Sequence, residues 1–203
     1  MLDSSKNLEK TVKSWTSNNH KKALKPQVLG QPNIPKALHG INPRTIMGLT
    51  AWKRFSQIKR VNEPYCHACG AENCILDLHE DYDICYSSLT MRIRDYVPLC
   101  KSCHSFIHSG LLRVLVAQRA VSKERAKQVL ERGFELCKAS NIKVFSGTIQ
   151  LARELGMGDV MVKSWTPPMN SEGWGQWKLI YEDTEYLGLT FEQWYKQYGA
   201  AVR

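Results

Sequence analysis

Two Cys-x-x-Cys pairs constrain the fold of this chain more than any other feature. The first pair is Cys66 and Cys69, the second is Cys100 and Cys103, and 30 residues separate them. Each pair forms a tight turn that presents two thiolates to one ion, and four thiolates complete the tetrahedral shell that zinc prefers. We therefore predict a structural Zn²⁺ site at these four cysteines, with a hairpin between the two turns. Such an ion would supply much of the local folding free energy.

Three histidines lie close to these cysteines in the sequence. His79 falls in a stretch whose alternating side chains predict a strand. His104 and His108 are four residues apart, so one helical face would present both imidazoles to one cation. A helix can carry two incidental histidines, but here the first directly follows a zinc-binding cysteine. Because four thiolates already fill a zinc shell, the histidines are available for a second, chemically active site.

The other cysteines and the start of the chain bear on the cellular compartment. Seven cysteines are an odd number for a disulfide framework, and the sequence begins without an apolar signal segment. No run of about 18 apolar residues is present to cross a membrane. We expect reduced thiols, no membrane contact and a cytoplasmic location in a bacterial or phage-infected cell. Cys74, Cys85 and Cys137 are expected to be buried thiols, and His67 a solvent-facing spacer in its turn.

The positive charge is concentrated toward the N-terminus. Residues 1–60 hold 12 Lys and Arg against only Asp3 and Glu9, whereas the whole chain has a net charge of +9. Such a basic block favours a polyanionic partner, because Lys and Arg bound to phosphates release counterions. A solubilising tail is the alternative, but the nearby metal site favours nucleic acid, with DNA as the expected partner. The residues expected to contact it are Lys21, Lys22, Lys25, Arg44, Lys53, Arg54, Lys59 and Arg60.

Composition divides the chain into three regions. Residues 1–45 are polar, basic and interrupted by prolines and glycines, which predicts a largely irregular arm outside the core. Residues 46–140 hold the cysteines and histidines, and we expect a zinc-containing core with flanking helices. Residues 141–203 predict a helix followed by an aromatic-rich α/β segment that packs on this core.

Hydrophobic spacing predicts the elements of the central region. An amphipathic helix is expected over 46–60, with inward side chains Leu49, Trp52, Phe55 and Ile58. A strand over 75–80 would place Asp77 and His79 on one face, and Leu76, Leu78 and Glu80 on the other. A second strand is expected within 84–97, after a loop near 81–83 or 87–88. A short helix over 102–109 would end at Gly110.

Further elements are predicted toward the C-terminus. An apolar stretch covers 111–119, and a helix over 122–139 would be capped by Ser122, with Glu124 in its first turn. Another helix is expected over 146–156, ending at Gly156. A strand over 176–181 and a terminal helix over 191–198 complete the aromatic-rich segment.

The central segment resembles the HNH (His-Asn-His) endonuclease family in its zinc-bearing, phage-like form. In the ββα-metal motif of that family, a hairpin carries the first histidine, a loop the asparagine and a helix the last histidine, while zinc knuckles brace the hairpin. Here His79, His104, His108 and the cysteine pairs match in order and spacing over about 45 residues. Asp95 stands where the family commonly has asparagine. The resemblance implies an α+β fold, with a zinc-braced ββα-metal motif embedded in a mainly helical domain.

The resemblance also implies a metal-dependent endonuclease that hydrolyses phosphodiester bonds in DNA. In one arrangement His79 is the general base, and Asp95 orients it or shapes the loop. His104 and His108 then hold Mg²⁺ or another divalent ion, with Asp77 or Asp81 nearby. We prefer this arrangement, because an imidazole with a pKa near ~6.5 suits neutral pH. In the other, all three histidines hold the ion and Glu80 is the base, which requires its pKa to be raised from ~4.

Two other classes of function stay open. A zinc-stabilised nucleic-acid-binding or adaptor protein would keep the motif without catalysis, and the aspartate at position 95 favours this class. A protein-binding factor would instead use the aromatic C-terminal segment as its interface with a protein partner. The sequence predicts neither a target site nor an oligomeric state.

Overall fold

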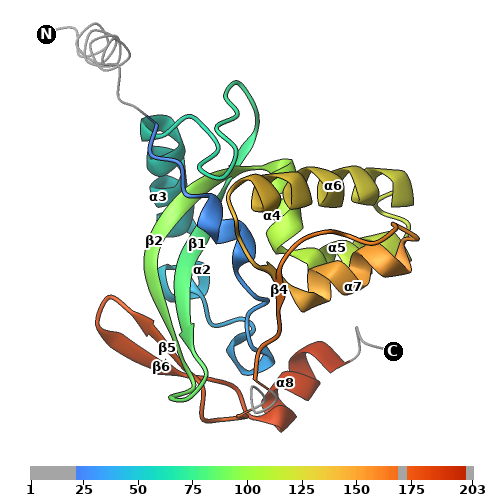
Figure 1. Ribbon diagram of the computed structural model, residues 1–203. Coiled ribbons are helices and arrows are strands. Elements are labelled where there is room, and N and C mark those ends of the chain that lie inside the picture. The colour runs from blue at the N-terminus through green and yellow to red at the C-terminus, as the bar shows by residue number, and fades with distance from the viewer. Residues whose placement is uncertain (1–21, 169–172, 200–203) are drawn as a thin grey trace, which may run out of the picture.

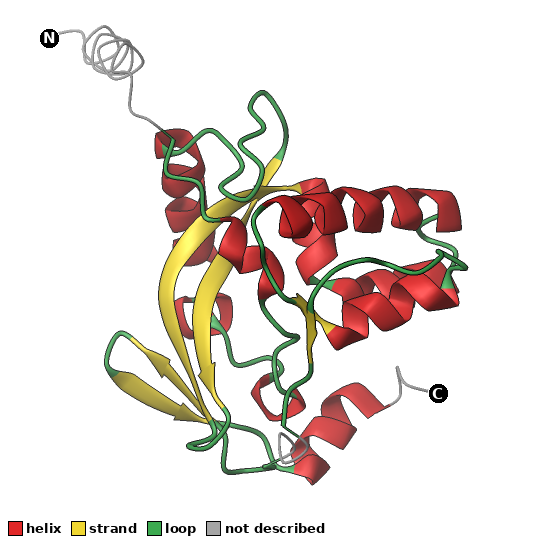
Figure 2. Cartoon of the chain, viewed as in Figure 1, coloured by secondary structure: helices red, strands yellow, loops and turns green. Residues whose placement is uncertain are grey.

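A computed structural model describes residues 22–168 and 173–199, which form a mixed α/β fold (Figures 1 and 2). The four-stranded sheet has the order β1-β2-β5-β6, with β1 (Leu76–Cys85), β2 (Thr90–Cys100), β5 (Lys178–Tyr181) and β6 (Thr184–Leu187). Strands β1 and β2 form a long antiparallel hairpin, β5 runs parallel to β2, and β6 is antiparallel to β5. Two short parallel strands, β3 (Val144–Phe145) and β4 (Ser164–Trp165), form a second sheet. Helices and strands are thus both present, as the sequence predicted.

The hairpin confirms the predicted strand around His79 and extends it. His79 pairs with Val97 and Glu80 with Tyr96, so adjacent residues of β1 face opposite sides of the sheet. The predicted loop at 81–83 is wrong, because β1 continues to Cys85 and the alternation of apolar side chains continues with buried Tyr82. The turn falls at 86–89, which confirms the other predicted position. A register shift between Asp81 and Tyr82 marks a β-bulge, a feature that increases strand twist.

Helices α2 (Pro43–Met47) and α3 (Leu49–Asn62) lie on one side of the hairpin (Figure 1). The predicted amphipathic helix over 46–60 is therefore present, with a break at Gly48, whose φ is +83°. Trp52 and Phe55 pack edge-on against Tyr96 of β2, with ring centroids 5.8 and 4.8 Å away. The prediction that Leu49 and Ile58 face inward is wrong. They are 58% and 50% exposed, because α3 contacts the hairpin through a narrower stripe.

Four helices cover the other side of the hairpin, namely α4 (Lys101–Ile107), α5 (Ser109–Ala117), α6 (Lys123–Ala139) and α7 (Ser146–Glu154). Ser122 caps α6 by accepting a hydrogen bond from the Arg125 backbone N–H, as predicted. The predicted helix end at Gly110 is wrong. The break between α4 and α5 falls at His108, and Gly110 lies inside α5, where Leu112 continues the buried face. Gly156 follows α7 with a φ of +72°, in agreement with the predicted helix end.

The segment before α2 contributes to the core. The 3-10 helices η1 (Pro26–Gly30) and η2 (Lys36–Leu38) bury Val28, Leu29, Ala37 and Leu38. Val28 and Leu29 join the core between the hairpin and α4–α7. Ala37 and Leu38 join a second core with Trp177. The expectation that residues 1–45 lie outside the core is therefore wrong for 26–38, since apolar residues between the prolines are buried. Residues 1–21 lie outside the described part of the chain.

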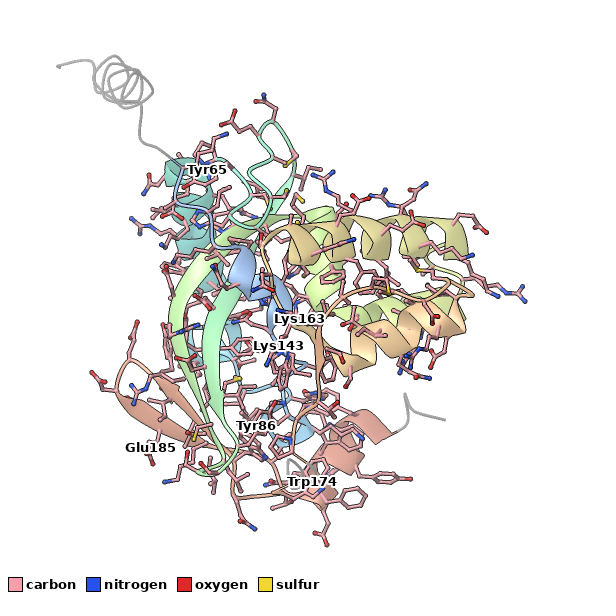
Figure 3. The ribbon with its side chains drawn as sticks, viewed as in Figure 1. Tyr65, Tyr86, Lys143, Lys163, Trp174 and Glu185 are labelled. Atoms are coloured by element: carbon pink, nitrogen blue, oxygen red, sulfur yellow. The ribbon has the colours of Figure 1, made fainter. Side chains whose placement is uncertain are left out.

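The aromatic-rich segment joins the sheet and the second core. Strand β5 pairs with β2, which confirms the strand predicted over 176–181, and Trp177 is fully buried beside it. Helix α8 (Phe191–Tyr198) matches the predicted terminal helix. Trp174, labelled in Figure 3, packs against Phe191 and Trp194 of α8, with ring centroids 5.5 and 5.7 Å away. These aromatic side chains therefore pack on one another within the fold.

Candidate metal centres

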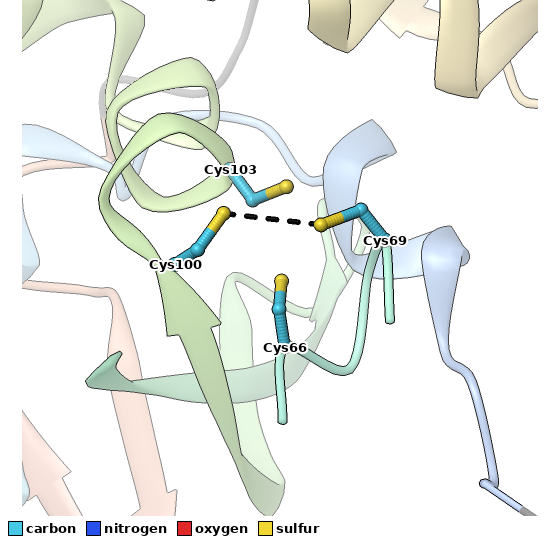
Figure 4. A group of neighbouring side chains, drawn as sticks. All are labelled: Cys66, Cys69, Cys100 and Cys103. Atoms are coloured by element: carbon cyan, nitrogen blue, oxygen red, sulfur yellow. Dashed lines mark hydrogen bonds between the residues drawn. The ribbon is translucent and has the colours of Figure 1, made fainter. Parts of the chain in front are cut away.

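The four predicted zinc cysteines converge at one end of the hairpin (Figure 4). Cys66 and Cys69 lie on the loop before β1, Cys100 ends β2, and Cys103 lies in α4. Their Sγ atoms all lie within 4.8 Å of one another, and those of Cys69 and Cys100 are 3.9 Å apart. Sulfurs about 2.3 Å from a tetrahedral zinc ion lie about 3.8 Å apart. All seven cysteines are free thiols, so this donor set suits a zinc ion.

Backbone hydrogen bonds shape the first cysteine turn. The Gly70 N–H donates to the Cys66 carbonyl over 2.7 Å, and the φ of +75° at Gly70 reverses the chain. The His67 N–H donates to Pro98 O of β2 over 2.9 Å, which ties the turn to the hairpin. The Arg132 guanidinium of α6 donates to Cys69 Sγ over 3.4 Å, which ties this turn to α6.

Two expectations about the neighbouring residues need correction. His67 is buried rather than solvent-facing, since it stacks on Tyr65 with ring centroids 4.8 Å apart and lies 3.0 Å from the Glu63 carboxylate. The turn packs against the end of α3, and this covers the imidazole. Of the three cysteines expected to be buried, only Cys137 is, whereas Cys74, on the loop before β1, and Cys85, the last residue of β1, are exposed.

The three histidines form a second group of potential ligands. His79 comes from β1, His104 from α4 and His108 from the end of that helix. One ring nitrogen of each lies within 4.8 Å of the others. Small side-chain rotations would reach the separation of about 3.4 Å expected for nitrogens about 2.1 Å from one ion.

The hydrogen bonds of these histidines determine which nitrogens are free. The Nε2 atom of His79 is 3.2 Å from Gln31 Oε1, and its buried Nδ1 has no hydrogen-bond partner within residues 22–168 and 173–199. His104 Nδ1 lies 3.1 Å from a carboxylate oxygen of Asp77, which leaves Nε2 available. A buried nitrogen without a partner, beside two further imidazoles, fits a shared metal ion.

The protonation state of the three rings also suits metal binding. Burial lowers the pKa of His79 well below its ordinary value, and the nearby His108 and His104 lower it further. Burial lowers the pKa of His108 to about 4. Burial also lowers the pKa of His104, although the Asp77 carboxylate opposes this. The rings are therefore neutral at neutral pH, and the neutral imidazole is the form that binds a metal.

A cleft of about 660 Å³ opens beside the histidines. His104 and His108 line it together with Asp77 and Glu80, and α2 and α3 contribute the basic residues Arg44, Lys53 and Arg60. Burial raises the pKa of the Glu80 carboxyl, with a smaller opposing effect of the Arg44 charge. The cleft thus combines nitrogen ligands, a carboxylate with a raised pKa and a basic wall, and basic side chains of this kind bind phosphates.

The cationic residues predicted to contact nucleic acid fall into separate groups. Besides the three in the cleft, Arg54 is exposed on α3. Lys22 pairs with Glu72, and both Lys25 and Lys59 pair with Asp95. Lys21 lies outside the described residues.

Asp95, which the resemblance expects to orient the base or shape the loop, is held by two lysines. Its carboxylate pairs with Lys25 and Lys59 and accepts from the Tyr96 N–H over 2.7 Å. Burial acts to raise its pKa, but the hydrogen bond from Lys25 and the other charges lower it overall. Asp95 lines a different hollow, together with Lys25 and Gln31.

Two further residues belong to the histidine group, namely Asp77, which was expected near the ion, and Gln31, which had no assigned role in the sequence. Asp77 was visible as a strand residue near His79, and its pairing with His104 follows from the way α4 folds back on β1. Gln31 lies 48 residues before His79 in a proline-interrupted segment, and no local pattern pointed to it.

Comparisons with protein-family models, with curated proteins and with solved structures found no match for this chain. The similarity to the HNH family therefore stays a prediction from the residues of the central segment. Among the helices of the described residues, none is both long and apolar enough to span a membrane.

Proposed function

We propose that this protein is a divalent-metal-dependent endonuclease of the HNH type that hydrolyses phosphodiester bonds in DNA. One observation carries the proposal: His79, His104 and His108 present nitrogens within 4.8 Å of one another, and two of them line a cleft with a basic wall. The four cysteines form a separate group, so a structural zinc ion would leave this site free. The order of hairpin and helix also agrees with the ββα-metal motif implied by the resemblance.

The burial of His79 favours the arrangement in which all three histidines hold the ion. A general base must reach the water that it deprotonates. His79 is 1% exposed and its Nε2 faces Gln31, so only Nδ1 is available, beside the other two rings. Glu80 faces the side of the sheet opposite His79, but β1 is an edge strand, and Glu80 lines the same cleft as His104 and His108. Its raised pKa brings the carboxylate closer to neutral pH. We therefore assign the base to Glu80 and a ligand role to His79.

The residues of the chain would then act as follows. An ion at the histidines would act as a Lewis acid that polarises the scissile phosphate and stabilises the leaving oxygen. Glu80 accepts the proton of the attacking water, and Asp77 orients His104 through its Nδ1–H. Lys53 and Arg44 bind the phosphates on either side of the cleft. Arg60 also donates to the Leu76 carbonyl over 3.2 Å, which fixes α3 relative to β1.

Nicking of supercoiled plasmid by the zinc-loaded protein in Mg²⁺, Mn²⁺ or Ni²⁺ tests this function. We expect Glu80→Gln to abolish nicking while ion binding is retained, and His79→Ala and His108→Ala to abolish both. Glu185→Gln, on the remote strand β6, is the matched control and should nick normally. Nicking that persists in Glu80→Gln, or ion binding that persists in His79→Ala, would contradict these assignments.

The basic wall has its own test. Lys53→Ala should weaken DNA binding and reduce the slope of log K against log salt by about 0.9, the value for one lost phosphate contact. Lys196 is exposed on α8, and Lys196→Ala should change neither the DNA affinity nor the salt slope. Equal slopes for the wild type and Lys53→Ala would exclude this residue from the interface.

A zinc-stabilised nucleic-acid-binding protein without catalysis is the second candidate. The partners of Asp95 favour it, because ion pairs with Lys25 and Lys59 occupy this carboxylate at the position where the family has asparagine. Retardation of DNA without nicking in each of the three ions would support this candidate over the nuclease.

A further inference from the structure

Gln31 makes three hydrogen bonds at the end of η1. Its Nε2 donates to Asp81 Oδ1 and to the Tyr82 carbonyl, each over 3.1 Å, and its Oε1 is 3.2 Å from His79 Nε2. The residue is only 9% exposed. A buried amide whose donors and acceptor are all used has a defined orientation.

The partners of Gln31 determine where the protons lie. The Tyr82 carbonyl can only accept, and Asp81 Oδ1 already accepts from Arg94 over 3.1 Å. The amide nitrogen must therefore face these two oxygens, which turns Oε1 toward His79. Because an amide oxygen can only accept, Nε2 of His79 carries the hydrogen and Nδ1 carries the lone pair.

We infer that Gln31 is a positioning residue that holds His79 in the Nε2–H tautomer and directs its Nδ1 lone pair at the cation site. The use made of this lone pair depends on the proposed function, whereas the tautomer itself does not. The opposite tautomer would place two lone pairs against each other and leave a buried N–H without a partner in the described structure.

The backbone on both sides of Gln31 is anchored, so the amide has little freedom to turn. The Gly30 carbonyl accepts from the Trp165 indole N–H over 3.1 Å, and the Pro32 carbonyl accepts from the Tyr82 hydroxyl over 2.6 Å. A Cβ at Gly30 would lie 2.8 Å from the Lys143 carbonyl, which shows how closely this segment packs. The segment around Gln31 thereby supplies a hydrogen-bond partner to His79 of β1, 48 residues away in the sequence.

Nitrogen NMR of the full-length, zinc-loaded protein with ¹⁵N-labelled histidines tests the tautomer without a second ion. We expect His79 to show a protonated Nε2 and an unprotonated Nδ1. The Gln31→Met variant keeps the side-chain length but has no amide to form hydrogen bonds. In this variant His79 should no longer favour the Nε2–H tautomer. Gln27→Met, exposed on the same 3-10 helix, is the matched control and should keep the wild-type spectrum.

Calorimetric titration with Ni²⁺ tests the consequence for the cation site. Mutating the hydrogen-bond partner of a ligating histidine typically lowers metal affinity about 10- to 100-fold. We therefore expect a decrease of this size in the Ni²⁺ affinity of Gln31→Met and no decrease in that of Gln27→Met. Retention of zinc at the cysteines by both variants shows that the fold is intact. A wild-type His79 protonated at Nδ1, or unchanged Ni²⁺ affinity in Gln31→Met, would overturn the inference. Absence of Ni²⁺ binding in the wild type, with the expected tautomer present, would overturn the proposed cation site instead.

Discussion

Replacing Gly133 with alanine tests the packing that holds α4, the helix carrying both groups of ligands. Gly133 lies in α6, and a Cβ there would meet Cδ2, Cε2 and Cγ of Phe106 at 2.0, 2.3 and 2.4 Å. The Phe106 ring is 1% exposed and is held edge-on against Phe134, with centroids 5.5 Å apart. Because the ring has no free space to turn into, α4 itself must move.

The size of the effect follows from these distances. Carbon atoms are best separated by about 3.5 to 4.0 Å, so the ring must withdraw by about 1.5 Å. Overpacking of this kind costs about 1–3 kcal/mol, and alanine regains about 1 kcal/mol of helix propensity over glycine. Contacts of 2.0 to 2.4 Å place this site at the upper end of that range, so we expect Gly133→Ala to lower the free energy of unfolding by about 2 kcal/mol. Since α4 carries Cys103 of the cysteine group, zinc should also be lost faster to a chelator.

Urea unfolding at fixed zinc concentration measures this change. Gly158→Ala is the matched control, because no atom lies within 4 Å of its Cβ position, and it should shift stability by less than about 0.5 kcal/mol. Adding Phe106→Leu to Gly133→Ala should recover part of the loss, with a coupling energy that a double-mutant cycle reports. A Gly133→Ala variant as stable as the wild type would refute the tight packing of α4 on α6.

Three further predictions concern the cysteines and the C-terminal helix. Chelating the zinc ion should unfold the junction of the hairpin with α4, seen as a loss of circular dichroism that added Zn²⁺ restores; an unchanged spectrum would contradict a structural ion. Hydrogen bonds from Ser87 and Ser88 lower the pKa of exposed Cys85 to about 7, whereas slight desolvation and the nearby cysteines raise the pKa of Cys74. Iodoacetamide should therefore modify Cys85 faster than Cys74 at neutral pH. Mass spectrometry measures the modification rates of the two cysteines, and Ser87→Ala should slow only the modification of Cys85. Burial lowers the pKa of His39, whose Nδ1 accepts from the Trp194 indole N–H over 3.2 Å. As the pH falls through about 6.5, the unfolded state therefore binds more protons than the folded state. The free energy of unfolding should therefore decrease from pH 7.5 to 5.5, and an equal decrease in His39→Asn would exclude His39 as the cause.

Local patterns predicted most of the elements. The helical spacing around Trp52, the Ser122 cap and the strand alternation at His79 depend on contacts within a few residues, and the structure confirms each of them. Gly110 shows the limit of such patterns. A glycine after a short helix is a common end signal. Here, however, Gly110 lies in the first turn of α5, which begins at Ser109 and buries Leu112 in the core.

Other expectations failed because burial depends on partners far away in the sequence. Residues 26–38 look like a polar arm, yet their few apolar side chains fill two cores made by later segments. His67 is covered by the end of α3, and Asp95 is turned toward Lys25 by an ion pair that spans 70 residues. Nothing in the neighbouring residues encodes these contacts.

The sequence by itself determined the cysteine group, because the two-residue spacing within each pair is set by the geometry of one tight turn around an ion. It also determined that three histidines belong to the hairpin and the helix that follows. Only the tertiary structure decided their surroundings, by burying His79, placing Glu80 in the cleft and bringing Gln31 within 3.2 Å of the His79 imidazole. The physical reason is that the tautomer, the pKa and the solvent access of a side chain depend on the atoms packed around it, and these come from distant parts of the chain.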